Sequence, residues 1–129
     1  MKTIIHTDDA PKAVGPYSQA VRTGSLLFTA GQVAIDPAIG KLIEGDVAAQ
    51  AEQVMRNLQA VLTAAGTGFE HVVKTTVFLV DMADFAALNG VYGRYFPQNP
   101  PARSTFAVRG LPLGALVEIE MVAEIPEAN

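Results

Sequence analysis

The 129-residue chain has no cysteine and only two histidines. Without cysteine it can form no disulfide, and it offers a metal no thiolate ligand. His6 and His71 lie far apart in the sequence and have no partners at the spacing of metal ligands, so the sequence predicts no zinc or iron site. Nothing in this composition points to an oxidising compartment.

Long apolar runs and an excess of positive charge are also missing. No run approaches the roughly 18 residues that a membrane span requires, and segment 1–15 has no apolar core of signal-peptide length. The net charge of −4 argues against nucleic acid as a partner, because proteins that bind it usually carry a basic patch. We therefore expect a cytoplasmic protein with neither a membrane nor a nucleic-acid partner.

Two common catalytic motifs are absent. No glycine-rich loop joins a strand to a helix in the pattern that cradles phosphates. No nucleophile elbow is present, and neither histidine has a convincing serine partner. What is present indicates one folded domain over residues 1–129, since half of the residues are hydrophobic and only 17% are charged.

Apolar residues at intervals of three and four predict a first helix from the N-cap Asp46 to about Ala65, where Gly66 stops it. Its apolar stripe belongs to the core and leaves Gln50 and Asn57 mostly outside.

A second helix is predicted to begin at Asp81 or Asp84 and to end before Pro97. Gly90 and Gly93 each weaken this helix by about 1 kcal/mol relative to alanine, so either another group approaches them closely or packing elsewhere compensates. Its buried stripe is predicted to contain Phe85, Leu88, Tyr92, Tyr95 and Phe96.

Alternating and β-branched runs predict five strands, at 2–6, 26–35, 71–80, 103–109 and 116–125. The run 26–35 is apolar on both alternating faces, so we expect it to be buried on both. Two helices can cover only one face of such a sheet. The other face would still carry Phe28, Ala30, Phe78 and Val80, which predicts a further copy of the chain as partner.

The stretch from Pro100 to Phe106 contains the candidate ligand-binding residue. Two prolines stiffen the backbone directly before Ala102 and Arg103, and a guanidinium can bind a carboxylate with two parallel hydrogen bonds. Alternation is expected to bury Phe106 in the core and to place Arg103 and Thr105 together on the opposite face, which Glu118 of the strand at 116–125 is expected to share. The alternative is an ordinary surface ion pair of Arg103.

Five other residues are candidates for a role in a site. Glu118 and Glu120 are about 7 Å apart on one strand face, where each would raise the pKa of the other; a solvated edge strand is the alternative. Gly31 indicates a bulge or a close approach by another group. Tyr17 is expected to be a half-buried packing residue, and Asn89 a solvated or capping residue.

Together these residues resemble the Rid family of reactive-intermediate deaminases, also called the YjgF family, and most closely its RidA branch. The resemblance covers nearly the whole chain, with matching stretches in family order at 10–21, 29–33, 46–66, 72–89, 95–97, 101–105 and 116–123. It implies an α+β, chorismate-mutase-like subunit with a mixed sheet and two helices on one face. It further implies a homotrimer with a barrel-like core and clefts between neighbouring subunits.

The resemblance also implies an activity without a cofactor or metal: hydrolysis of small enamines and imines, such as 2-aminoacrylate, to 2-keto acids and ammonia. Arg103 would bind the substrate carboxylate, with Tyr17 and Asn89 lining the cleft. Gly31 would let the substrate approach the backbone. Glu118, together with the main-chain carbonyl of Thr105, would position the attacking water.

Two positions depart from the family pattern. Ala30 stands where RidA members commonly have serine, and Thr105 stands where they often have cysteine. Both put substrate preference and rate in question more than the class of reaction. Three alternatives therefore stay open: a non-catalytic binder of small acids or interaction protein, a deaminase of a larger imine, and a ribonuclease. Whether Glu118 or Glu120 faces the cleft is also open.

Overall fold

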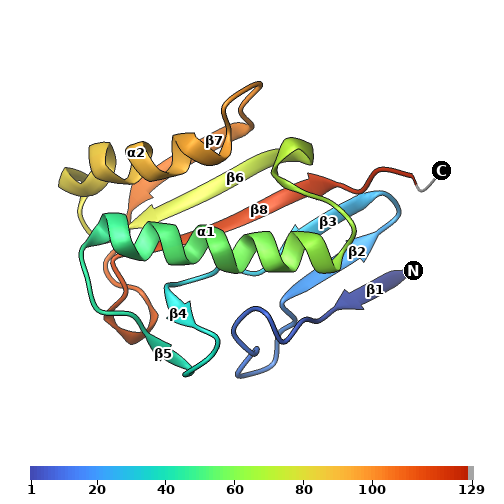
Figure 1. Ribbon diagram of the computed structural model, residues 1–129, viewed down its shortest axis with the longest axis horizontal. Coiled ribbons are helices and arrows are strands. Elements are labelled where there is room, and N and C mark those ends of the chain that lie inside the picture. Colours follow the sequence, from blue (N-terminus) through green and yellow to red (C-terminus); the bar gives the residue numbers. More distant parts are fainter. Residues whose placement is uncertain (128–129) are drawn as a thin grey trace.

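The computed structural model describes residues 1–127, which form a six-stranded mixed sheet with both α-helices on one face (Figure 1). The strand order is β1-β2-β3-β8-β6-β7, and only β6 and β7 are parallel. The strands are β1 (Lys2–Ile5), β2 (Ala20–Thr23), β3 (Leu26–Thr29), β6 (Val72–Leu79), β7 (Ala102–Ala107) and β8 (Val117–Glu124), and β4 (Ile35–Asp36) and β5 (Lys41–Leu42) form a separate hairpin. The helices are α1 (Val47–Ala64) and α2 (Phe85–Tyr95), and short 3-10 helices lie at Phe69–His71, Met82–Asp84 and Pro112–Gly114. The predicted α+β class is confirmed.

Helix α1 begins and ends where the sequence predicts. The Asp46 side chain accepts a hydrogen bond from the Ala49 amide at 3.0 Å, and Gly66 has the positive φ of +84° that a helix stop favours. The placement of two polar residues was wrong, because Gln50 and Asn57 are buried. Gln50 accepts from the Leu116 amide at 2.8 Å and Asn57 donates to the Ile35 carbonyl at 2.9 Å, so both bind partly buried backbone groups of neighbouring segments.

Helix α2 follows a 3-10 turn that Asp81 caps by accepting from the Ala83 amide. No group within residues 1–127 approaches Gly90 or Gly93 closely, so of the two alternatives compensation by packing elsewhere on α2 is the one left, with Leu88, Val91 and Tyr92 buried. A Cβ at either glycine would have no neighbouring atom within 4 Å, and both residues are exposed.

The two faces of the sheet differ in what covers them. Strand β8 alternates as predicted, with Val117, Ile119, Met121 and Ala123 buried beneath the helices and Glu118 and Glu120 on the helix-free face. The prediction of a strand buried on both faces at 26–35 is wrong. Strand β3 ends at Thr29, and although Leu27 is fully buried, Leu26 and Phe28 are 38% and 44% exposed on the helix-free face.

Strand β7 is turned over relative to the expectation. Phe106, predicted for the core, is 46% exposed, whereas Arg103 and Thr105 are half-buried. The register explains this orientation. Arg103 pairs with Thr75 and Thr105 pairs with Val77, both of which are buried on the helix side of β6. Alternation correctly predicted which residues share a face. The apolar face was wrongly assigned to the core, because β7 is an edge strand whose core side carries polar groups.

Candidate functional site

Arg103 leaves the edge strand β7 and lies in a cradle that α2 provides. Phe85, Asn89 and Tyr92 follow each other at intervals of four and three residues, so their side chains share one face of the helix. The Asn89 Oδ1 atom accepts a hydrogen bond from Arg103 Nη1 at 2.8 Å. The guanidinium carbon lies 5.3 Å from the ring centre of Phe85 and 4.8 Å from that of Tyr92, distances that permit cation–π attraction to both.

The positive charge of Arg103 has no carboxylate partner among residues 1–127. The ion pairs there join His6 to Asp8, Arg56 and Arg94 to Glu52, and His71 to Glu70. The alternative of a surface ion pair for Arg103 is therefore not borne out in the part of the chain that the structure describes. A half-buried guanidinium bonded to one neutral amide keeps donors free for an external anion.

A hollow of about 520 Å³ lies beside this guanidinium. Arg103 and Asn89 supply its polar groups, and the remaining lining residues are Tyr92, Gly93, Phe96, Pro100 and Pro101. Burial raises the pKa of Tyr92, although its hydrogen bond with Thr75 and the charge of Arg103 oppose that shift. Tyr92 is therefore a neutral phenol near pH 7, and the cation is the one full charge of the hollow.

Thr105 lies two residues beyond Arg103 on the same side of β7. Its Oγ1 atom is buried and has no hydrogen-bond partner within residues 1–127. A buried hydroxyl without a partner costs about 1–3 kcal/mol. The expected role of the Thr105 main-chain carbonyl stays a prediction.

A second group of predicted residues lies at Glu118 and Gly31. A Cβ built on Gly31 would come within 2.8 Å of Glu118 Cδ, so the group that approaches this glycine is the glutamate side chain. The backbones of their neighbours Gln32 and Ile119 are joined by two hydrogen bonds, of 2.9 and 3.2 Å. Burial raises the pKa of Glu118, and the Glu120 carboxylate adds to that shift.

Tyr17 lies in the N-terminal loop and is 54% exposed, so its predicted role in half-buried packing is wrong. The loop is held by Gln19, which is buried and donates to the carbonyls of Thr7 and Pro11 while accepting from the Thr7 amide. The main-chain carbonyl of Gln19 also accepts a hydrogen bond from the Ala30 amide at 2.9 Å. One buried residue thus connects the loop of Tyr17 to the turn that carries Ala30 and Gly31.

The predicted site residues form two groups that one subunit does not bring together. Arg103, Asn89 and Thr105 lie on the helix side of the sheet, whereas Glu118 pairs with Phe78 on the helix-free face. The sequence interpretation that Arg103, Thr105 and Glu118 share a face is therefore wrong. Sequence reasoning also assigned Phe85 and Tyr92 to the core alone, although their four- and three-residue spacing around Asn89 could have identified the cradle.

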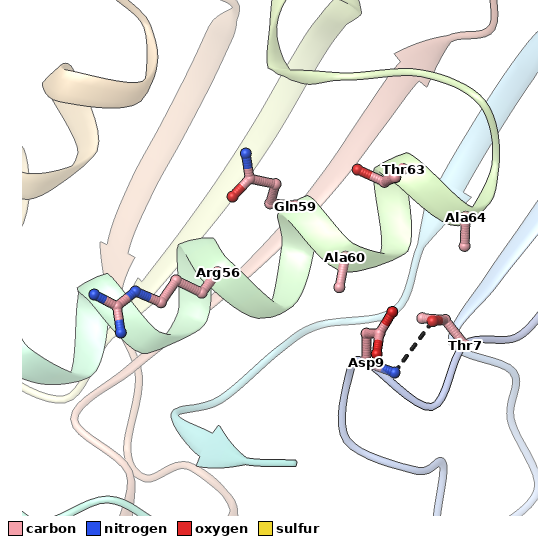
Figure 2. Close-up of a pocket in the computed structure, with 7 residues that line it drawn as sticks. All are labelled: Thr7, Asp9, Arg56, Gln59, Ala60, Thr63 and Ala64. Atoms are coloured by element: carbon pink, nitrogen blue, oxygen red, sulfur yellow. Dashed lines mark hydrogen bonds between the residues drawn. The ribbon is translucent and has the colours of Figure 1, made fainter. Parts of the chain in front are cut away.

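A separate shallow hollow of about 320 Å³ lies between α1 and the N-terminal loop. Figure 2 shows Arg56 extending along the helix away from Asp9, whose amide donates to Thr7 Oγ1. No predicted site residue lies in this hollow. Among residues 1–127, no three His, Asp or Glu side chains cluster as metal ligands would, and no helix is long and apolar enough to cross a membrane.

Comparisons with known proteins agree over almost the whole chain. A family described as Endoribonuclease L-PSP matches residues 7–125. Protein DfrA of Myxococcus xanthus is 56% identical, with 92% of both chains covered, and the 2-iminobutanoate/2-iminopropanoate deaminase of Homo sapiens is 46% identical, with 95% of this chain and 90% of the human protein covered. The crystal structure of E. coli TdcF with bound serine has a TM-score of 0.90 at 41% identity and covers 95% of this chain and 98% of that one.

Proposed function

This chain belongs to the Rid family, which includes the proteins described as Endoribonuclease L-PSP, and from that premise we propose that it is a deaminase of small 2-keto acid imines. Its substrates would be 2-aminoacrylate, the tautomer 2-iminopropanoate, and 2-iminobutanoate. The observation that carries the proposal is the half-buried guanidinium of Arg103, which has no carboxylate partner in residues 1–127. Every proposed substrate brings one carboxylate.

The reaction would need positioning more than a covalent nucleophile. Arg103 would bind the carboxylate through two parallel hydrogen bonds, leaving the adjacent iminium carbon exposed to water. Water adds to that carbon and gives up a proton to form the neutral carbinolamine. The C–N bond then breaks, and ammonia leaves as the carbonyl of the 2-keto acid forms.

Glu118 would take and return the proton in these steps. Its pKa is raised by burial and by Glu120, which brings the carboxyl closer to the range in which it can exchange protons near neutrality. The main-chain carbonyl of Thr105 would hold the attacking water from the side of Arg103. Tyr17 and Gly31 would line the cleft on the side of Glu118.

A complete cleft would require two copies of the chain. Arg103, Asn89 and Thr105 of one copy would face Tyr17, Ala30, Gly31 and Glu118 of its neighbour. The helix-free face supports such an assembly, because it exposes Leu26, Phe28 and Phe106 by 38–46%. We propose a homotrimer in which these faces enclose a barrel-like core and three clefts lie between neighbours.

A second candidate is a non-catalytic binder of small acids that uses the same cleft. Ala30 favours it, because this position commonly carries a serine hydroxyl in RidA members. The relative TdcF was crystallised with serine, a small amino acid. Ribonuclease activity, which the family description suggests, fits poorly with a net charge of −4 and no histidine pair.

The direct test generates 2-aminoacrylate with a dehydratase and follows keto-acid release with and without the protein. We expect acceleration by the parent and at least about 100-fold less by Arg103→Ala, because the variant loses a charge-assisted bidentate contact. Arg94→Ala is the matched control, since Arg94 lies on the same helix as the cradle but pairs with Glu52.

Two outcomes would argue against the proposal. If the parent does not accelerate keto-acid release, or if Arg103→Ala is as active as the parent, the deaminase proposal fails. Saturable binding of 2-ketobutyrate without turnover, lost in Arg103→Ala, would establish the binder instead.

A further inference from the structure

Thr75 is a polar residue in the middle of the core. It lies on β6, the strand next to the edge strand β7, is 0% exposed, and shares a 2.7 Å hydrogen bond with the hydroxyl of Tyr92, a residue that is itself 6% exposed. A buried hydroxyl needs a partner, and this bond pairs both hydroxyls with each other. The bond therefore ties one end of the Tyr92 ring to the sheet.

The same ring is one wall of the arginine cradle. Thr75 is the register neighbour of Arg103 on the parallel strand, so both side chains leave the sheet on the same side. Tyr92 reaches down from α2 between them: its hydroxyl meets Thr75, and its ring lies 4.8 Å from the guanidinium carbon. Fixing the hydroxyl end fixes the position of the ring against which the guanidinium rests.

The remaining contacts restrain Arg103 from other directions. Asn89 holds Nη1 at 2.8 Å, and the Phe85 ring lies 5.3 Å from the guanidinium carbon. One hydrogen bond to a neutral amide leaves the plane of the guanidinium free to turn about that bond. The Tyr92 ring is the closer of the two aromatic walls and the only one anchored by a hydrogen bond to the sheet.

We propose that Thr75 and Tyr92 are positioning residues, whose shared hydrogen bond sets the plane in which Arg103 presents its donors to a substrate carboxylate. Neither residue is a catalytic residue, because Thr75 acts only through Tyr92, and Tyr92 acts through Arg103. The proposal rests on the proposed function in one respect, namely that the anion held by Arg103 is a carboxylate of a keto-acid imine.

The test uses Thr75→Val, Tyr92→Phe and the double variant in the full chain. Either single variant leaves the other hydroxyl buried without a partner, so both singles lose stability. The double variant removes both hydroxyls and is expected to recover part of that stability, while the anchor of the ring stays lost. If the NMR signal of Arg103 and the affinity for 2-ketobutyrate remain changed in the double variant, the change cannot be explained by lost stability and is due to the lost anchor of the ring.

The matched control is Tyr95→Phe. It removes a tyrosine hydroxyl from the same helix, but that hydroxyl donates to Glu52 at 2.6 Å and does not approach Arg103. All variants are compared at a temperature at which each is fully folded.

The first readout is the NMR signal of the Arg103 Nε–H group, assigned by its disappearance in Arg103→Lys. Because Arg103 is the one arginine of residues 1–127 that lies over aromatic rings, ring currents should shift its signal upfield of the other arginines. We expect the signal to move towards the others or to broaden in Thr75→Val, Tyr92→Phe and the double variant, and to stay in place in Tyr95→Phe.

The second readout is the affinity for 2-ketobutyrate. We expect Kd to rise by about three- to tenfold in both single variants, which is within the range that a disturbed cation–π contact allows. The double variant should be no weaker than the weaker single variant, because all three lose the same bond. In the deaminase assay KM should rise while kcat changes little, since the carboxylate is held alike in the ground and transition states.

The two readouts keep this proposal distinct from the proposed function. An unchanged Arg103 signal in the double variant, or an equal change in Tyr95→Phe, overturns the positioning role whatever the activity. In a further outcome, the Arg103 signal shifts in the variants although the parent protein neither binds 2-ketobutyrate nor deaminates. That result supports the positioning role and overturns the proposed function. Additive losses of affinity in the double variant would also contradict the single shared bond.

Discussion

The two halves of the candidate site are held in different ways. Side chains of α2 hold Arg103, through the Asn89 amide and the rings of Phe85 and Tyr92. The surroundings of Glu118 are formed by backbone. Its side chain lies against Gly31, which has no side chain of its own, and the main chains of Gln32 and Ile119 are joined by hydrogen bonds. We infer that the cation side is open to tuning by substitution, whereas the carboxylate side tolerates little change of shape.

The halves also carry opposite charges that remain apart. Neither Arg103 nor Glu118 takes part in an ion pair within residues 1–127, and the sheet separates them. Complementary charges on opposite faces of one chain can meet when neighbouring copies assemble around an axis. We therefore expect substitutions on the Arg103 side and on the Glu118 side to lower activity independently of each other.

After the loss expected for Arg103→Ala, the largest effect should come from Gly31→Ala on the carboxylate side. The added Cβ would lie 2.8 Å from Glu118 Cδ and 3.0 Å from Cγ, so the glutamate must move. A displacement near 1 Å can cost about 100-fold in rate, and we expect a loss of about 10- to 100-fold in kcat/KM. Keto-acid release measures it, with Gly110→Ala as control because a Cβ there meets no atom within 4 Å. Equal activity of Gly31→Ala and the control would contradict the tight fit.

A smaller effect concerns the pH dependence of stability. Because burial and Glu120 raise the pKa of Glu118 in the folded chain, the native state holds this proton at pH values where the unfolded chain has lost it. The contribution of Glu118 to stability should therefore decrease as the pH rises from about 4.5 through the raised pKa. In Glu118→Gln that decrease should be reduced, which urea unfolding at a series of pH values measures. Parallel curves for parent and variant would contradict the shift.

The smallest effect should come from Thr105→Val on the cation side. Its hydroxyl is buried without a partner, so its replacement by a methyl group should raise the free energy of unfolding by about 1 kcal/mol. Urea unfolding of parent and variant checks this value. A loss of stability would mean that the hydroxyl has a partner in the assembled protein, and that Thr105 contributes more than its main chain.

Periodicity predicted the parts of the fold that depend on one segment at a time. The stripe and caps of α1 and the alternation of β8 lie where the sequence indicated. The orientation of β7 could not be predicted in this way, because the apolar Phe106 lies on the helix-free face and Arg103 beneath α2. Which face an edge strand turns to the core depends on its register with β6, and no local pattern encodes that pairing.

The candidate site residues could be named from the sequence one by one, but their arrangement in space could not. Arg103 stood out because two prolines precede it, and Gly31 because a glycine interrupts an apolar run. The hydrogen bond of Thr75 to Tyr92 and the buried hub at Gln19 are contacts between distant segments, so spacing gave no sign of them. The separation of Arg103 from Glu118 likewise follows from the sheet and not from either stretch alone.

The most direct test of a site shared between copies mixes two inactive variants, Arg103→Ala and Glu118→Gln. After subunit exchange, verified by native mass spectrometry, a cleft between a neighbour with intact Arg103 and one with intact Glu118 is complete. Random exchange at equal amounts should restore about a quarter of the parental clefts, and deaminase activity should recover accordingly. Activity that stays at the level of the separate variants after verified exchange would contradict the shared site.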